Sequence, residues 1–93
     1  MIKQMFSIYD EKSQVYSPIY LYVHDGEALR DFMEAAADSQ SKLSKYPSDF
    51  KIYKLGFFND CTGVIESLTI PELFVNVVDL LKKEIVNVDD SAV

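Results

Sequence analysis

The sequence FKIYKLGFFNDCTGVIESLTI, residues 50–70, decides the fold. Residues 50–58 and 63–70 are rich in β-branched and aromatic side chains, which favour strands. Between them, the polar run Asn-Asp-Cys-Thr-Gly is typical of a hairpin connection. Gly63 at its end suits a backbone position with positive φ. The stretch therefore predicts two antiparallel strands joined by a hairpin.

Two further extended segments precede this hairpin. Residues 3–9 alternate, so that Gln4, Phe6 and Ile8 fall on one face of a predicted strand. Residues 16–23 are again β-branched and aromatic. Pro18 within them has no backbone N–H, which favours an edge strand or an extended segment over a central strand.

Helical periodicity occurs twice. Asp25 is a good N-cap for a helix over residues 26–38, and the polar residues 39–48 after it predict a loop. Thr69 and Glu72 have the spacing of a capping box, which predicts a second amphipathic helix over residues 71–85. The first apolar stripe consists of Ala28, Leu29, Phe32, Met33 and Ala36, and the second of Phe74, Val77, Val78, Leu81 and Ile85.

The length of 93 residues allows one hydrophobic core. We expect a single globular domain over residues 1–86 and an acidic, frayed tail over residues 87–93. The element order indicates an α+β fold, with a small, mainly antiparallel sheet of three to four strands and two helices packed on one face.

The composition excludes several classes of function. Nine basic and fifteen acidic residues give a net charge of −6, which opposes binding to duplex nucleic acid or an anionic membrane through the net field. The single Cys61 and single His24 make neither an intrachain disulfide nor a thiolate zinc site, so no metal or cofactor is expected. The N-terminus has no apolar signal region, and a reducing cytosol is the expected setting.

Catalytic motifs are missing, which favours a non-enzymatic protein. Cys61 and His24 could form a nucleophile–base pair. The favoured interpretation is a half-buried turn cysteine and a strand-end histidine without chemistry, because no signature context accompanies them. Asp31 and Glu34 are a carboxylate pair on the first helix, and Asp89 and Asp90 are another in the tail. Solvated surface charge is the simpler interpretation of both pairs.

The charges are unevenly distributed along the chain. Residues 40–55 carry a net +3, whereas residues 25–38 carry −4 with Arg30 as the only base. The basic segment also contains aromatic residues, and on its strand Tyr53, Leu55 and Phe57 should share a face. If Tyr9, Tyr20, Tyr22 and Tyr53 lie on the open face of the sheet, they form a stacking platform worth about 1–3 kcal/mol per base of single-stranded nucleic acid. The alternative is that these tyrosines pack against strands or a partner.

The sequence also resembles a known family. Met5–Asp10 (MFSIYD), followed by Lys12, Tyr16 and Pro18, resembles the start of the small non-structural protein of gokushoviruses, single-stranded DNA phages of the Microviridae. The resemblance extends over residues 3–66 through ALRDF (28–32), KYPSDF (45–50), LGFF (55–58) and Gly63. It implies a phage protein of the host cytoplasm that binds DNA. It also implies a likeness to the microvirus C protein, which helps switch replication from duplex copying to single-strand synthesis and packaging. No catalytic residues come with the family.

Two functions follow as hypotheses. In the first, the protein binds single-stranded DNA through Arg30, Lys42, Lys45, Tyr46, Lys51, Tyr53 and Lys54. In the second, it is an acidic interaction module that recruits a replication or capsid-assembly protein without contacting DNA. The apolar surplus of the second helix would then serve as a partner or homodimer contact through Leu73, Val77 and Leu80, unless that helix only covers its own sheet. No membrane partner is expected.

Overall fold

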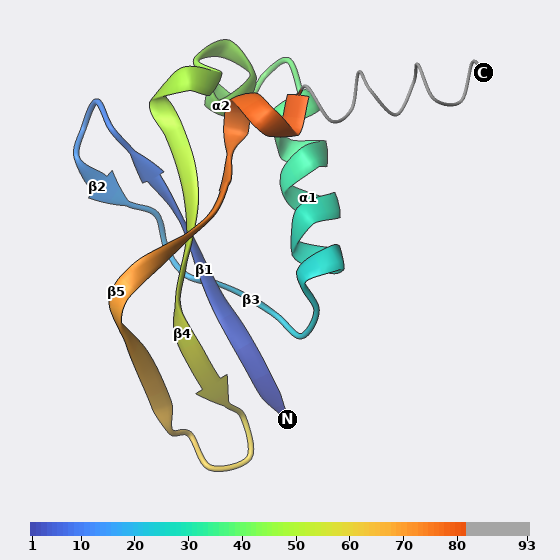
Figure 1. Ribbon diagram of the computed structural model, residues 1–93. Helices are drawn as coiled ribbons and strands as arrows, with labels where there is room; N and C mark the ends of the chain where they lie inside the picture. Colours follow the sequence, from blue (N-terminus) through green and yellow to red (C-terminus); the bar gives the residue numbers. More distant parts are fainter. Residues whose placement is uncertain (82–93) are drawn as a thin grey trace.

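Three long antiparallel strands build the centre of the molecule (Figure 1). The computed structural model describes residues 1–81, and the strand order is β2–β1–β4–β5, with β3 pairing with β1 as well. The fold is α+β, as predicted, although the sheet has five strands. The elements are β1 (Ile2–Asp10), β2 (Val15–Tyr16), β3 (Tyr20–Tyr22), α1 (Asp25–Ala37), α2 (Lys42–Lys45), the 3-10 helix η1 (Pro47–Asp49), β4 (Phe50–Asn59) and β5 (Ile65–Asn76).

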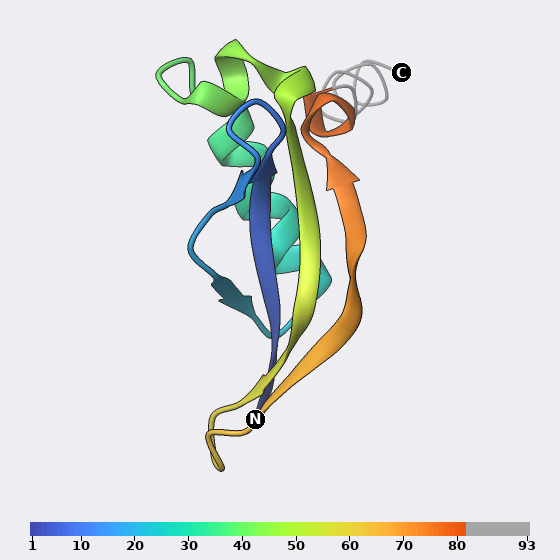
Figure 2. The ribbon, with the colours of Figure 1, turned by 90° about the vertical axis from the view of Figure 1, so that its left-hand side faces the viewer.

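The core lies between the sheet and α1. Phe6 of β1 is fully buried, and its ring meets Phe32 of α1 at 6.1 Å and Phe74 of β5 at 4.9 Å between centroids. Figure 2 looks onto the opposite face of the sheet, with α1 behind it, and no helix of residues 1–81 covers this open face. The buried residues that complete the core are Ala28, Ala36, Leu43, Phe50, Ile52, Val75, Val77 and Leu80.

The extended segment before α1 is divided in two, because Pro18 interrupts its pairing with β1. Ser17 compensates for this interruption. Its hydroxyl accepts the Ile8 N–H at 2.9 Å, and its own N–H donates to the Ile8 carbonyl at 2.8 Å. Fully buried Ser7 donates to the Ser17 carbonyl at 2.8 Å. These bonds hold the segment as an edge of the sheet, as the proline predicted.

The prediction for α1 is confirmed with one change at its start. The helix covers Asp25–Ala37, and its N-cap is His24 rather than Asp25. The Asp25 carboxylate instead pairs with Lys54 at 3.0 Å. The segment predicted as a loop contains α2 and η1, and Ser41 caps α2 by accepting the Ser44 N–H.

The predicted second helix is wrong for residues 71–76, which continue β5 instead. Their pairing with β4 extends to the Lys51–Asn76 pair, and the side chains of Phe74 and Val75 pack into the core. Tertiary pairing of β-branched and aromatic residues therefore overrides the helical spacing and the capping-box pattern. Residues 77–81 are helical, while residues 82–85 of that prediction and the predicted tail 87–93 lie outside the described residues.

A bulge in β4 changes which residues share a face. Met5 pairs with Gly56 and Phe6 with Lys54, so Leu55 has no partner in β1. The predicted common face of Tyr53, Leu55 and Phe57 is therefore wrong, because the extra residue shifts the alternation. A Cβ at Gly56 would collide with the Glu66 carbonyl oxygen, which explains a glycine here. The hairpin prediction is confirmed, with Gly63 at φ +76°.

Candidate nucleic-acid interface

Three tyrosines from three strands meet on the open face. The ring centroids of Tyr9 (β1) and Tyr16 (β2) are 4.7 Å apart, and that of Tyr53 (β4) is 6.2 Å from the first and 5.9 Å from the second. Strand register explains the arrangement. Tyr9 is directly opposite Tyr16 on one side. On the other side it lies two pairs from Tyr53, which is opposite Ser7, so all three side chains share a face. We call Tyr9, Tyr16 and Tyr53 the tyrosine cluster.

The tyrosine cluster retains accessible aromatic surface. Tyr16 is 45% exposed, and its two partners are half-buried. Leu73 of β5, opposite Tyr53, extends the apolar surface and is exposed. The rings are inclined to one another by 46° to 83°, so they offer separate ring faces on a sheet free of helix cover. Unpaired bases stack on exposed aromatic faces of this kind.

A lysine lies directly beside the tyrosine cluster. Lys51 is the cross-strand partner of Tyr9, and its Nζ is 2.6 Å from Glu11 Oε1 in the turn after β1. The hydrogen bond and charge of Glu11 raise the pKa of Lys51, so its ammonium is charged at neutral pH. Both side chains are open to water, where such an ion pair contributes little and exchanges readily with another anion.

A second polar-aromatic group lies at the same end of the sheet. Asp10 and Phe50, the next pair after Tyr9 and Lys51, alternate to the helix side of the sheet, where Phe50 joins the core. They border a hollow of about 310 Å³, which we call the end hollow, together with Lys12, Lys42, Tyr46 and Asp49. A backbone bond from Glu11 N–H to the Asp49 carbonyl, 2.9 Å, ties the strand turn to η1. Partial desolvation raises the pKa of the Asp10 carboxyl, but hydrogen bonds from Ser13 and from the Lys12 N–H outweigh this effect. The pKa of Asp10 is therefore lowered.

Lys54, predicted to bind DNA, lies on the opposite face. Its ammonium is 5.7 Å and 5.5 Å from the ring centroids of Phe6 and Phe74, and it pairs with Asp25 of α1. The Lys54 side chain is only 18% exposed. The structure therefore separates it from the tyrosine cluster and gives it a role in fastening α1 to the sheet.

Arg30 and Lys45 are also outside the tyrosine cluster. Arg30 is on the outer side of α1, where its Nε is 3.8 Å from the Asp31 carboxylate. Lys45 is exposed at the end of α2. Of the predicted DNA-binding residues, the structure thus brings Lys51 and Tyr53 together on the open face. It places Lys42 and Tyr46 at the end hollow on the helix side.

The expected row of four tyrosines is only half present. Tyr20 and Tyr22 pack on Phe32 of α1, at 5.7 Å and 5.9 Å between centroids, and so belong to the helix side. Burial, together with a hydrogen bond to Asp31, raises the pKa of Tyr22 to about 12. Sequence reasoning missed Tyr16. The polar turn after Asp10 could have indicated this residue. Strands that pair across such a turn place Tyr16 directly opposite Tyr9.

The predicted partner contact of the second helix is not available as a surface. Val77 and Leu80 are buried in the core, where they complete the packing under α1. Leu73 is exposed, but it lies on β5 beside Tyr53 rather than on a helix. A contact that needs all three side chains on one exposed face is therefore ruled out by the burial of Val77 and Leu80.

Comparison with known proteins identifies the family. The profile of a family described as Phage ORF5 protein matches residues 3–80. This chain belongs to the Phage ORF5 family. No curated protein and no solved structure gives a significant match to it. The matched region of this bacteriophage protein includes the whole tyrosine cluster, Lys51 and the end hollow.

The potential nucleophile, base and metal ligands of this Phage ORF5 family member lie apart within residues 1–81. Cys61 is in the β4–β5 turn and His24 precedes α1, and no hydrogen bond joins the two side chains. No group of three or more potential metal ligands comes together in this part of the chain. Nor does any helix within these residues have the length and apolar character of a membrane span.

Proposed function

We propose that this Phage ORF5 family protein binds single-stranded DNA, without catalysis, on the open face of its sheet. The observation that carries the proposal is the tyrosine cluster, whose three rings lie within 4.7–6.2 Å of one another on a helix-free face. Lys51 supplies a cation beside the rings. Unpaired bases would stack on the rings while phosphates pair with the lysine.

The acidic balance of the chain favours single strands over duplex in this proposal. A net charge of −6 repels the high charge density of duplex DNA, and binding must therefore come from local contacts. Stacking needs bases that are not already paired, and a duplex does not offer them.

The biological role we propose rests on the resemblance to gokushovirus proteins of the Microviridae. In the host cytoplasm, a single-strand binder would hold newly displaced strands apart from their complements. That property supports a change from duplex replication to single-strand synthesis and packaging. The family assignment supports a phage accessory protein.

The outer side of α1 favours a second candidate, an interaction module for a replication or capsid-assembly protein. Leu29, Met33 and Ala37 border a hollow of about 570 Å³ there, rimmed by Arg30 and by two acidic residues, Glu34 and Asp38. Such a surface suits a partner that presents an apolar side chain beside basic ones. This function would not require the tyrosine cluster.

A matched pair of variants tests the first proposal. Tyr16 and Tyr20 both lie in short edge strands and are 45% and 41% exposed, but they belong to opposite faces of the sheet. We expect Tyr16→Ala to weaken binding of fluorescent oligo-dT by about tenfold or more, as loss of a stacked base does. Tyr20→Ala should bind as the wild type does. Equal affinities for all three proteins would contradict the assignment of the open face.

A further inference from the structure

A second pairing of a lysine with an aromatic residue lies on the open face, at the N-terminal end of β1 (Figure 2). There Lys3 of β1 is directly opposite Phe58 of β4. In the same way, Tyr9 is directly opposite Lys51 at the other end. Tyr9 follows Lys3 by six positions, an even number, so the two side chains share a face, and at about 3.3 Å per residue the two pairs are about 20 Å apart.

The bulge in β4 brings Phe58 to this face. Phe58 follows Tyr53 by five positions, and an odd separation puts two residues on opposite faces of a regular strand. The extra residue of the bulge, Leu55, shifts the alternation, so that Gly56 and Phe58 share the open face with Tyr53. Phe57 is turned to the helix side by the same shift.

Phe58 borders an apolar hollow of about 260 Å³ on the open face. Leu21 is directly opposite Met5, and Ile65 is directly opposite Phe58, which places the hollow on this face. Its solvent-facing side chains are Ile19, Leu21 and Ile65, which are 49%, 42% and 57% exposed. Phe58 itself is half-buried. An open apolar hollow that contains an aromatic ring suits the flat face of an unpaired base.

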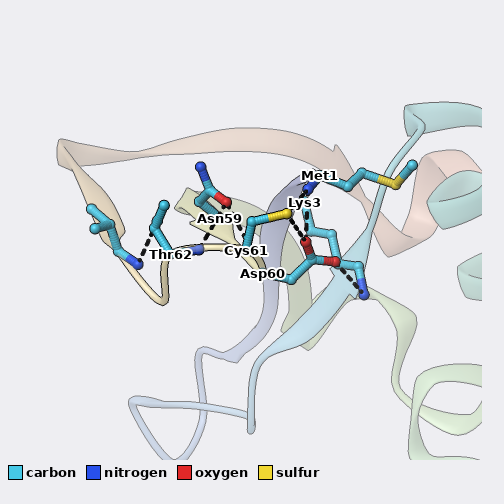
Figure 3. Close-up of polar contacts among 7 residues, drawn as sticks. Met1, Lys3, Asn59, Asp60, Cys61 and Thr62 are labelled. Carbon is cyan, nitrogen blue, oxygen red and sulfur yellow. Dashed lines mark hydrogen bonds and ion pairs between the residues drawn. The ribbon is translucent and has the colours of Figure 1, made fainter.

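Lys3 is held only loosely beside this hollow. Its Nζ is 3.5 Å from Asp60 Oδ2 in the β4–β5 turn, longer than the about 2.7–2.9 Å of a charge-assisted hydrogen bond (Figure 3). The other carboxylate oxygen of Asp60 is 2.7 Å from the Met1 ammonium. Lys3 and Asp60 are each 35% exposed, and such a pair contributes little. Lys3 can therefore exchange Asp60 for a phosphate, as Lys51 can exchange Glu11.

The charges of the three long strands are divided between the two faces of the sheet. On the open face, β1, β4 and β5 present Lys3 and Lys51 and no carboxylate. The acidic residues of these strands are all opposite residues of the helix side, with Asp10 opposite Phe50, Glu66 opposite Phe57 and Glu72 opposite Lys54. The open face is thus locally basic in a chain of net charge −6, which favours a polyanion along it.

We propose that Phe58 and Lys3 form a second subsite for single-stranded DNA, and that one strand runs along β1 between this subsite and the tyrosine cluster. The second subsite presupposes the DNA binding proposed above. A stacked strand advances about 3.4 Å per nucleotide, so a separation of about 20 Å corresponds to about six nucleotides. A strand that reaches both subsites binds more tightly, because its second contact is intramolecular.

Fluorescence anisotropy with labelled dT3 and dT8 at low salt tests the second subsite. The two steps between the bases of dT3 would each have to cover about 10 Å, about three times the stacked spacing, to reach both subsites. Wild-type protein should bind dT8 about 100-fold more tightly than dT3, whereas the larger number of registers on a single subsite gives only about sixfold.

Two neighbouring phenylalanines provide matched variants. Phe58→Leu removes an aromatic face and keeps an apolar side chain, and it should weaken dT8 binding by about fivefold or more. Binding of dT3, which the tyrosine cluster supports, should not change. The control is Phe57→Leu, the same substitution one position away on the helix side, where the side chain is 36% exposed. It should bind both oligonucleotides as the wild type does.

The lysine of the subsite is tested by salt dependence. Lys3→Gln should reduce the salt slope of dT8 binding by about 1, because one phosphate contact is lost. Arg30→Gln removes the same charge on the outer side of α1 and should leave the slope unchanged. Circular dichroism checks that each variant is folded. Lys3→Gln alone serves if Phe58→Leu is not, because the Lys3 side chain is 35% exposed.

The outcomes separate the second subsite from DNA binding itself. If dT8 binding depends on Tyr16 but is unchanged in Phe58→Leu and Lys3→Gln, the second subsite is wrong and the tyrosine cluster stands. Equal losses in Phe58→Leu and Phe57→Leu would also overturn the subsite. If the wild-type protein binds neither dT3 nor dT8 at low salt, the proposed function is wrong and the subsite with it.

Discussion

Lys51 and Lys54 are three residues apart on β4, yet they lie on opposite faces of the sheet and in different surroundings. Lys54 is held between two phenylalanine rings and an aspartate of α1, with 18% of its side chain exposed. Lys51 lies beside the tyrosine cluster in an exposed pair with Glu11, at 36%. The tyrosines divide in the same way, with Tyr22 packed on α1 and Tyr16 on the open face. The comparison shows that the sheet face, more than the residue type, decides which lysines and tyrosines hold the fold and which remain available.

The largest effect should come from the helix side. Phe6→Ala removes a fully buried ring that contacts Phe32 and Phe74, and we expect it to lower the free energy of unfolding by about 3–5 kcal/mol. Tyr16→Ala on the open face should lower it by less than about 1 kcal/mol, as surface changes do. Urea denaturation measures both. Similar losses in the free energy of unfolding for the two variants would contradict the claim that only the helix side stabilises the fold.

The two lysines should separate stability from binding. Lys51→Met should weaken oligo-dT binding and reduce its salt slope by about 1, because one phosphate contact is lost, with little change in stability. Lys54→Met should leave binding unchanged and lower the free energy of unfolding by roughly 1 kcal/mol through lost cation–π and ion-pair contacts. A loss of binding in Lys54→Met together with unchanged binding in Lys51→Met would contradict our assignment of the two faces.

A smaller effect is expected when Lys51 is released from its partner. Glu11→Gln removes the carboxylate that competes with DNA phosphate for Lys51, and oligo-dT affinity should rise by about 1.5–5-fold, the range of an exposed ion pair. Glu27→Gln, at the start of α1, removes the same charge without touching Lys51 and serves as the control. Equal gains in the two variants would mean that net charge, not this pair, sets the affinity.

The smallest effect concerns Tyr22 at high pH. Burial raises its pKa from 10.0 to about 12, so the folded state favours the neutral phenol more than the unfolded state does. The stability from this preference is fully present below pH about 10 and is lost as the pH rises through about 12. Tyr22→Phe should flatten the fall in stability over that window in urea titrations. If the stability of Tyr22→Phe falls with pH as steeply as that of the wild type, another titrating group causes the fall.

Local sequence signals predicted much of the fold. The hairpin, Gly63 and α1 followed from composition and periodicity, because each depends on residues close in sequence. The prediction of a second helix is wrong for residues 71–76. Their apolar residues have helical spacing, but the segment gains more stability from pairing with β4. Its capping-box pattern, Thr69 to Glu72, lies inside β5.

The candidate site was harder to predict because it depends on register. The sequence indicated Lys51 and Tyr53, but Tyr16 joins them only through its pairing with Tyr9 across the turn. Lys54 looked equivalent to Lys51 from composition alone. Their separation by an odd number of positions puts them on opposite faces of one strand, and only the placement of α1 shows which face is covered.

The most direct test of the account is a titration of fluorescent oligo-dT with the wild-type protein, followed by anisotropy at low and moderate salt beside a duplex of the same length. We expect binding to the single strand that weakens as salt rises, with little binding to the duplex. No binding to oligo-dT at low salt, or equal binding to the duplex, would contradict a single-strand interface on the open face and would favour a protein partner on the outer side of α1.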